Sequence, residues 1–127
     1  MYILRYTSIA TMPATPAPLP PHWFQMLLAL ADRDLHGLGI MHDVLDRSGG
    51  LVRLWPAMLY RNLQRLERLK LIAPTDGPNE PSAGSPRYYR LTAEGRKRCA
   101  EEAERLAGLV EVARARRILR KAGSSRA

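Results

Sequence analysis

The sequence is poor in the residues from which most catalytic and metal sites are built. It has one cysteine, Cys99, and three histidines, His22, His36 and His42, among 127 residues. A single cysteine excludes a disulfide framework within one chain and the ligand spacing of a zinc finger. The histidines are not grouped with acidic residues into a metal cage, and no catalytic triad, paired-carboxylate cleft or phosphate-binding glycine loop can be assembled. We therefore expect no enzyme activity, no cofactor and no bound metal.

Long hydrophobic runs are also missing. No window approaches the ~18 uncharged apolar residues of a membrane-spanning helix. The first ten residues contain no continuous apolar stretch of the kind found in a signal peptide. We therefore expect a cytoplasmic protein without a membrane partner. The length and the content of 46% hydrophobic and 25% charged residues are typical of a single globular domain.

Acidic residues are scarce relative to basic ones. The chain has 20 Lys and Arg residues and 12 Asp and Glu residues, for a net charge of +8 and a pI of about 10.4. This balance favours a polyanionic partner or an anionic membrane surface. Eleven of the basic residues but only four of the acidic ones lie between Arg47 and Arg98. The excess charge is thus concentrated in the middle of the chain.

Proline and the spacing of apolar residues divide the chain into segments. Prolines are dense between Pro13 and Pro21, which rules out a helix interior there. We expect residues 1–20 to form a flexible arm, with Met12 as a possible true start. Helices are predicted at about 21–31, 36–47, 56–71 and 93–121, with Thr92 as the cap of the last one. The second helix is predicted to bury Leu38, Met41, Val44 and Leu45.

Two further segments have strand composition. Residues 51–54 are expected to form a short strand-like link. Residues 72–75 and 87–91 flank a stretch rich in Gly and Pro, which predicts a β-hairpin. Tyr88 and Tyr89 should then point to opposite faces, one into the core and the other to the surface.

The helix predicted at 56–71 has two distinct faces. Leu59, Leu63, Leu66 and Leu69 recur at helical spacing and form the apolar face. The opposite face holds no acidic residue and consists of Ala57, Arg61, Gln64, Arg65 and Arg68. Arginine pairs bidentately with guanine or phosphate, and glutamine pairs in the same way with adenine. This face is therefore predicted to bind DNA, although a solvated basic face is the alternative.

The last helix carries a second pattern. Apolar residues recur in it at spacings of 4, 3, 4 and 3, at Cys99, Ala103, Leu106, Val110 and Ala113. Such a heptad-like seam requires a partner helix. The seam could also fold back on the first helix of the same chain. We expect both, in a homodimer whose shared interface is formed by the first and last helices of each subunit and includes Trp23 and Leu27. The exposed face is expected to carry the ion pairs Lys97–Glu101, Arg98–Glu102 and Glu101–Arg105.

The order of helix, helix, helix, hairpin and long helix is typical of a winged helix-turn-helix with an added C-terminal helix. Three motifs agree with it in order over about residues 21–117: His36-Gly-Leu-Gly-Ile40, Leu54-x-Pro56-x-x-Leu59-Tyr60-x-x-Leu63-x-x-Leu66 and Arg87-Tyr88-Tyr89-x-Leu91-Thr92-x-x-Gly95. With these motifs the chain resembles the PadR family of bacterial transcriptional regulators.

This resemblance implies a mainly α fold with a β-hairpin wing, whose third helix enters the major groove. It also implies a homodimer formed through the C-terminal helix, repression of transcription, and release from DNA by a small aromatic or drug-like effector. The expected partner is double-stranded DNA with an inverted-repeat operator. The expected DNA-binding residues are Tyr60, Arg61, Gln64, Arg65, Arg68 and Arg87. Candidates for an effector cavity at the dimer centre are Trp23, Phe24 and Met26, for which a filled dimer core is the alternative.

Three features depart from the family pattern. Trp55 stands where a Ser or Thr usually caps the third helix, Ala57-Met58 replaces a Gly/Thr type, and the wing tip carries the acids Asp76 and Glu80. Two other functions therefore remain open: a winged-helix module that binds an acidic protein, and a ligand-binding dimer that no longer binds DNA. The expected organisation is an arm at 1–20, a DNA-binding domain at 21–92, a dimerisation helix at 93–121 and a tail at 122–127.

Overall fold

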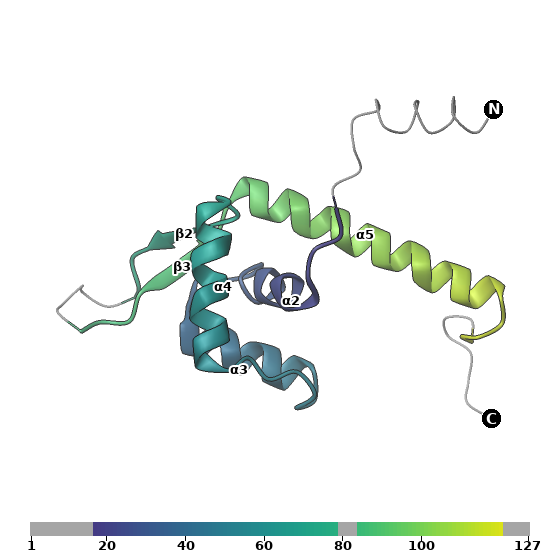
Figure 1. Ribbon diagram of the computed structural model, residues 1–127, viewed down its shortest axis with the longest axis horizontal. Coiled ribbons are helices and arrows are strands. Elements are labelled where there is room, and N and C mark those ends of the chain that lie inside the picture. Colours follow the sequence, from purple (N-terminus) through teal and green to yellow (C-terminus); the bar gives the residue numbers. More distant parts are fainter. Residues whose placement is uncertain (1–16, 79–83, 121–127) are drawn as a thin grey trace.

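The computed structural model describes residues 17–78 and 84–120 and is mainly helical (Figure 1). Its elements follow the order α2 (Pro21–Ala29), β1 (Leu35–His36), α3 (Gly37–Arg47), α4 (Pro56–Arg68), β2 (Ile72–Thr75), β3 (Tyr88–Leu91) and α5 (Ala93–Ala115). Three short helices are followed by a β-hairpin and a long helix. This arrangement confirms the predicted winged helix-turn-helix fold with an additional C-terminal helix.

Helix α2 occupies the centre of the molecule and packs against both α3 and α5 (Figure 1). Its sequence is apolar on nearly every face, so it is stable only where neighbours cover several sides. Met26 and Leu27 have no solvent-accessible surface, and Ala29 and Leu30 are almost fully buried. The core is therefore built around this helix.

Helix α3 buries a different face from the one that the sequence predicts. Of the four positions expected to be buried only Val44 is, and Leu38 is 46% exposed. The buried face consists instead of Gly37, Ile40 and Val44. Gly37 lies directly against the ring of Tyr60 on α4. Because the Tyr60 ring leaves no room for a side chain at Gly37, the face of α3 that carries this glycine packs on α4. The spacing of the large apolar residues does not indicate this contact.

The wing is a three-stranded antiparallel sheet in the order β1-β3-β2. The predicted hairpin is confirmed, with Ile72 opposite Leu91. The third strand is β1, in which Leu35 lies opposite Tyr89. Residues 51–54 do not form a strand, and the link is instead anchored by Leu54, which is fully buried. A two-residue strand has no periodicity of its own, so β1 could not be predicted.

Helix α5 begins as predicted and ends earlier. The Thr92 hydroxyl accepts a hydrogen bond of 2.9 Å from the Gly95 N–H, so Thr92 is the cap. The helix ends at Ala115 rather than near residue 121, which lies outside the described residues. Its 23 residues span about 35 Å. No residue from Ala103 to Ala115 is buried, and Figure 1 shows this half extending beyond the other helices.

The acidic side chains of α5 pair at a different spacing from the predicted one. Arg98 lies 3.9 Å from Glu101, and Arg105 lies 2.6 Å from Glu102. These pairs are three residues apart, whereas the predicted pairs were four apart. Glu102 turns inward because its carboxylate binds the N-terminal segment, which removes it from the exposed face.

That segment is ordered where the structure describes it. Leu19 is buried, and its N–H donates a hydrogen bond of 3.2 Å to Glu102 Oε1. Arg98 donates a hydrogen bond of 3.3 Å to the Ala17 carbonyl. Residues 17–20 thus contact α5, and the flexibility predicted for the arm at 1–20 stays a prediction. Residues 1–16 and the predicted tail at 122–127 lie outside the described residues.

Candidate nucleic-acid interface

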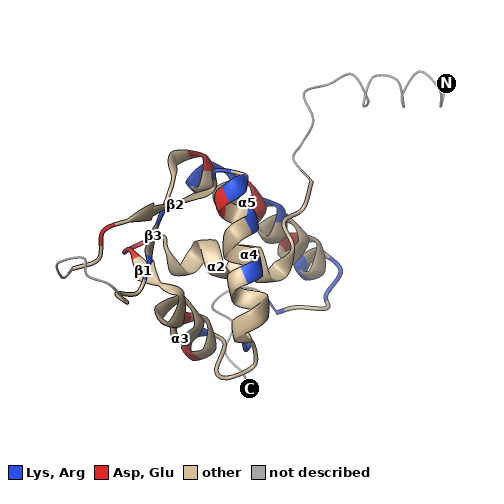
Figure 2. Ribbon diagram, turned by 60° about the vertical axis from the view of Figure 1, so that its left-hand side comes forward, with Lys and Arg blue, Asp and Glu red and all other residues tan. Residues whose placement is uncertain are grey.

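Helix α4 separates its leucines from its arginines. Leu59, Leu63 and Leu66 are buried against the core. The predicted DNA-binding face is exposed along its whole length, at Ala57, Arg61, Gln64, Arg65 and Arg68. In Figure 2 the basic residues of α4 appear as blue segments. The structure thus gathers the predicted recognition residues on one surface, while their contact with DNA stays a prediction.

The arginines of this surface are not neutralised by any of the described residues. In the described part of the molecule, no ion pair joins Arg61, Arg65 or Arg68 to a carboxylate. The acid on this helix, Glu67, is half-buried and lies on the side toward the wing. Three free guanidiniums on adjacent turns repel one another unless an anion lies between them. The surface is therefore suited to a polyanion.

Two contacts hold α4 from either side. On one side the Trp23 indole N–H donates a hydrogen bond of 3.0 Å to the Asn62 side-chain carbonyl. On the other, the Tyr60 ring and hydroxyl lie against Gly37 at the start of α3. Because Tyr60 is still 48% exposed, it both braces the helix and borders the basic face. Asn62 was not predicted as a site residue, since nothing in the sequence connects it with a partner 39 residues away.

The ends of α4 are defined by the backbone. Pro56 occupies the first turn, and Trp55 precedes it in extended conformation without a side-chain cap. At the other end Lys70 is left-handed, with φ of 64°, and the Leu71 N–H donates to the Leu66 carbonyl at 3.0 Å. Leu69, predicted as part of the apolar stripe, is 54% exposed because the helix ends before it.

Arg87 at the base of the wing is engaged within the chain. Its guanidinium lies 3.4 Å from a carboxylate oxygen of Glu67 and 5.9 Å from the ring centroid of Tyr89. Burial raises the pKa of the Tyr89 hydroxyl, and the nearby Arg87 charge partly offsets the increase. Arg87 is exposed and so remains a candidate for phosphate contact, but its charge is already shared with Glu67.

The two tyrosines of β3 point to opposite faces. Tyr89 is 7% exposed and belongs to the core. Tyr88 is half-buried, and its ring stacks on His36 with a centroid separation of 5.2 Å. The predicted alternation is therefore correct, and Tyr88 serves to hold the wing against the start of α3.

The predicted dimer and effector residues are found in different environments. Leu27 and Met26 are inaccessible, so they cannot touch a second subunit or a ligand in this conformation. They are covered because α3 and α5 of the same chain pack on α2, and their roles in a dimer or an effector site stay predictions. Trp23 and Phe24 are half-buried, and the indole of Trp23 is bound to α4.

The predicted seam of α5 divides into two parts. Cys99 is covered by its own chain, and burial raises the pKa of its thiol. Ala103 and Val110 are exposed, and Leu106 and Ala113 are half-buried. Only the second part of the seam is thus available to a partner.

The described residues provide neither a metal site nor a membrane-spanning helix. Within residues 17–78 and 84–120 there is no group of three or more His, Cys, Asp or Glu side chains placed to hold a metal ion. Among the described helices, none has the length and apolar character needed to cross a lipid bilayer.

Comparison with known proteins agrees with this geometry. The model of the transcriptional regulator PadR-like family matches residues 26–101, which is more than half of the chain. Among curated protein sequences no match was found.

Three solved structures are similar in fold. A transcriptional regulator from Clostridium thermocellum has a TM-score of 0.63 at 24% identity, covering 71% of this chain and 86% of its own. A PadR-like transcription factor from Bacteroides fragilis has a TM-score of 0.61 at 20% identity, covering 91% and 98%. A PadR family regulator from Clostridium difficile has a TM-score of 0.58 at 23% identity, covering 73% and 96%.

Proposed function

Because the chain belongs to the PadR-like family of transcriptional regulators, we propose that it is a sequence-specific DNA-binding protein that acts as a homodimer. The observation that carries this proposal is the exposed face of α4, where Arg61, Arg65 and Arg68 have no acidic partner among the described residues. A face of this kind fits the major groove, whose edges accept hydrogen bonds from guanidinium groups.

In the proposed complex the residues of α4 have separate roles. Arg61 and Arg65 lie one turn apart at the centre of the exposed face and would read base edges. Gln64 beside them would pair with adenine. Arg68, in the last turn, would contact a phosphate, which positions the helix without reading sequence. Trp23 and Gly37 would keep α4 rigid as it enters the groove, through the contacts with Asn62 and Tyr60.

The homodimer is supported by the second half of α5. Leu109, Val110 and Val112 are 55%, 39% and 45% exposed on a helix that leaves the body of the molecule. Apolar side chains in such a projecting helix are stabilised when a second helix covers them. Two copies related by a twofold axis would present two α4 helices to an inverted repeat with half-sites about 34–36 Å apart, or a multiple of it.

We further propose that the protein represses transcription and is released from DNA by a small-molecule effector. The support for release is the position of Trp23, which is half-buried and hydrogen-bonded to Asn62 of α4. A ligand that displaced this indole would break the hydrogen bond that joins α2 to the recognition helix. Phe24, also half-buried on α2, is the neighbouring candidate for ligand contact.

The test begins with selection of DNA from a random pool by the purified protein. Binding of the selected duplex is then followed by fluorescence anisotropy for the wild type, Arg61→Ala, Arg65→Ala and the control Arg116→Ala. Arg116 is exposed at the far end of α5, so its removal takes away the same charge outside the proposed interface. Loss of a base-reading arginine should cost about 1–3 kcal/mol and relax the preference at one base position.

Two outcomes would contradict the proposal. If no duplex is selected, and the protein nevertheless forms a dimer, a ligand-binding dimer without DNA binding is the better description. If binding depends little on salt and duplex DNA fails to compete with an acidic protein, the module binds proteins instead. A steep decrease of log Kobs with log salt is expected for DNA, because phosphate contacts release counterions.

A further inference from the structure

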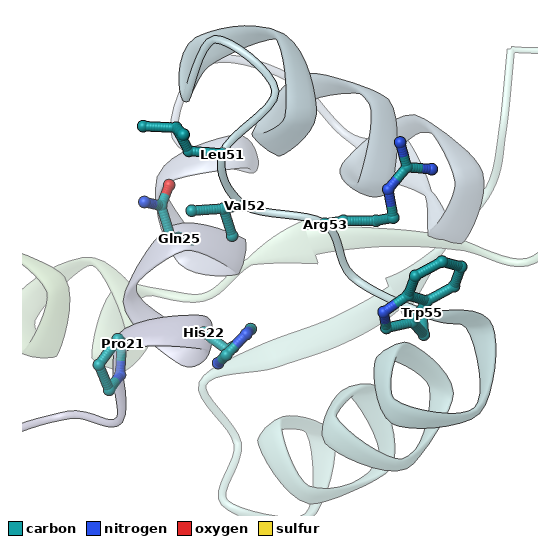
Figure 3. A pocket seen from close by; sticks show the side chains of 7 residues that line it. All are labelled: Pro21, His22, Gln25, Leu51, Val52, Arg53 and Trp55. Atoms are coloured by element: carbon teal, nitrogen blue, oxygen red, sulfur yellow. The ribbon is translucent and has the colours of Figure 1, made fainter.

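A second feature of the chain lies beside the recognition helix, where the start of α2 meets the link that leads into α4. A cavity of about 440 Å³ opens there. Figure 3 shows His22 and Gln25 on α2 on one side of it, and Val52 and Trp55 of the link on the other. None of the side chains that line this cavity is acidic.

The link carries an exposed aromatic–cation pair. The Arg53 guanidinium lies 5.3 Å from the centroid of the Trp55 ring. Trp55 is 62% exposed, and Arg53 is exposed and has no carboxylate partner in the part of the chain that is described. Leu51, which lines the same cavity, is 89% exposed, so the apolar surface here belongs to a patch and not to a single side chain. The pair is therefore a candidate contact surface for a binding partner.

The position of this pair relates it to the recognition helix. Trp55 immediately precedes α4, so the pair lies at the N-terminal end of this helix. The helix dipole places a partial positive charge at that end. Trp55 supplies no hydrogen-bond acceptor to the first turn of α4, and that turn holds no acidic residue. The first turn of α2, on the other side of the cavity, also has no acid. The local field therefore favours an anion.

We propose that Arg53 and Trp55 bind the sugar–phosphate backbone of DNA next to the groove that α4 reads, with the guanidinium donating to a phosphate oxygen and the indole packing on the adjacent deoxyribose. This proposal rests on the DNA-binding function proposed above. It also gives a role to the tryptophan that stands in place of a hydroxyl cap. The ring holds the guanidinium in position from one face and leaves its N–H groups free to donate.

The shape of the cavity favours a backbone over a small molecule. Sites for small ligands enclose most of the ligand surface. Here Trp55 is 62% exposed and Leu51, which lines the same cavity, is 89% exposed. Walls this open cannot enclose a small ligand, but they can lie along the ridge of a duplex.

The test measures binding to the selected duplex and to two duplexes of unrelated sequence, over a series of salt concentrations. The variants are Arg53→Gln, Trp55→Leu and Trp55→Phe, with Arg116→Gln as the charge-matched control. We expect Arg53→Gln to weaken binding roughly tenfold on all three duplexes. We also expect it to lower the salt slope by about two, because each copy of the dimer loses one phosphate contact. Arg116→Gln should leave both quantities unchanged.

The tryptophan has its own readout. Trp55→Leu should weaken binding, and Arg53→Gln should then have a smaller further effect, whereas Trp55→Phe should retain most of the affinity. The chain has two tryptophans, so the difference in emission between the wild type and Trp55→Phe reports Trp55, with the Trp23–Asn62 hydrogen bond intact in both proteins. Addition of duplex DNA should change this emission, while sodium benzoate or inorganic phosphate at the same concentration should not.

The outcomes separate the two proposals. If the wild type binds no duplex, the proposed function fails. If Arg65→Ala weakens binding but Arg53→Gln and Trp55→Leu behave like Arg116→Gln, the proposed function stands and the backbone site is overturned. A saturable response of Trp55 to benzoate without DNA would assign the cavity to a small anion, and would also overturn it.

Discussion

At the scale of single residues, two glycines of α5 lie in opposite surroundings. A Cβ added at Gly95 would lie 2.0 Å from the backbone oxygen of Leu71. A Cβ added at Gly108 would meet no atom within 4 Å. The same substitution, Gly→Ala, therefore tests packing at the first position and helix propensity at the second.

We predict that Gly95→Ala destabilises the fold by about 3 kcal/mol or more, because backbone at the junction of α4 and β2 must move to admit the methyl group. Gly108→Ala should stabilise it by about 1 kcal/mol, since alanine has the higher helix propensity. Urea unfolding at a fixed protein concentration measures both free energies. Equal effects of the two substitutions would show that the start of α5 is not tightly packed.

Trp55 gives a second prediction at this scale. The first turn of α4 has no side-chain cap, and a serine hydroxyl there would accept a hydrogen bond from a free backbone N–H. Both Trp55→Ser and Trp55→Ala remove the contact with Arg53, but only the serine supplies a cap. We predict that the serine variant is more stable than the alanine variant by about 1 kcal/mol in urea unfolding. Equal stabilities would mean that water or another group already satisfies this turn.

At the scale of elements, Glu102 connects α5 to the segment before α2. Its carboxylate accepts hydrogen bonds from Arg105 at 2.6 and 3.0 Å and from the Leu19 N–H at 3.2 Å. The Arg105 hydrogen bonds lower the pKa of Glu102 below its ordinary value of 4.5, and the Leu19 N–H adds to this effect. The ionised carboxylate is therefore the form that holds the segment.

This shift predicts how stability depends on pH. A carboxyl group with a lowered pKa in the folded state stabilises the fold above its unfolded pKa, and the contribution is lost as the pH falls through the folded value. We expect wild type to exceed Glu102→Gln in Tm at pH 7, and the difference to shrink below pH 4.5. Hydrogen exchange should show the Leu19 amide losing protection in the variant. A Tm difference that is constant from pH 7 to pH 3 would contradict this role.

The sequence predicted the elements that have a local signal, either an apolar period or a turn rich in Gly and Pro. Leucines at helical spacing identified α4 and placed Arg61 and Arg65 on its exposed face. The prediction failed where a contact between distant segments decides the structure. Gly37 turns α3 toward Tyr60, and β1 exists only because Tyr89 lies beside Leu35. Local pattern contains no information about such partners.

The prediction of the site was limited in the same way, because contacts between residues far apart in the sequence could not be predicted. The arginines of α4 followed from the pattern of one helix, whereas the contact of Trp23 with Asn62 links residues that are far apart in sequence. Leu27 was expected at a subunit interface because α2 is apolar on nearly all faces. In the structure α3 and α5 of the same chain cover it. An apolar face shows that a partner is needed but not which one.

At the scale of the whole molecule, the distribution of charge separates the surface suited to DNA from the surface suited to a second copy. The basic excess between Arg47 and Arg98 falls largely on α4, the wing and the start of α5. The projecting half of α5 carries exposed apolar side chains instead. One region is thus suited to a polyanion and another to a second copy, so a dimer formed through α5 leaves both copies of α4 free.

This separation predicts that DNA binding depends on a surface that does not touch DNA. Val110→Glu places a charge on the apolar side of the projecting half of α5. The control Ala115→Glu introduces the same side chain at the exposed last residue of the helix, about 140° around its axis from Val110. We expect Val110→Glu to shift the protein from dimer to monomer in sedimentation equilibrium, and Ala115→Glu to remain dimeric.

The monomeric variant should retain the fold, because Val110 is 39% exposed and contributes little to the core of its own chain. Its affinity for an inverted repeat should nevertheless decrease by about 100-fold or more, since the second half-site is no longer bound intramolecularly. Its affinity for a single half-site should equal that of wild type. A Val110→Glu protein that stays dimeric, or a monomer that binds the full operator as tightly as the dimer, would contradict the role of α5.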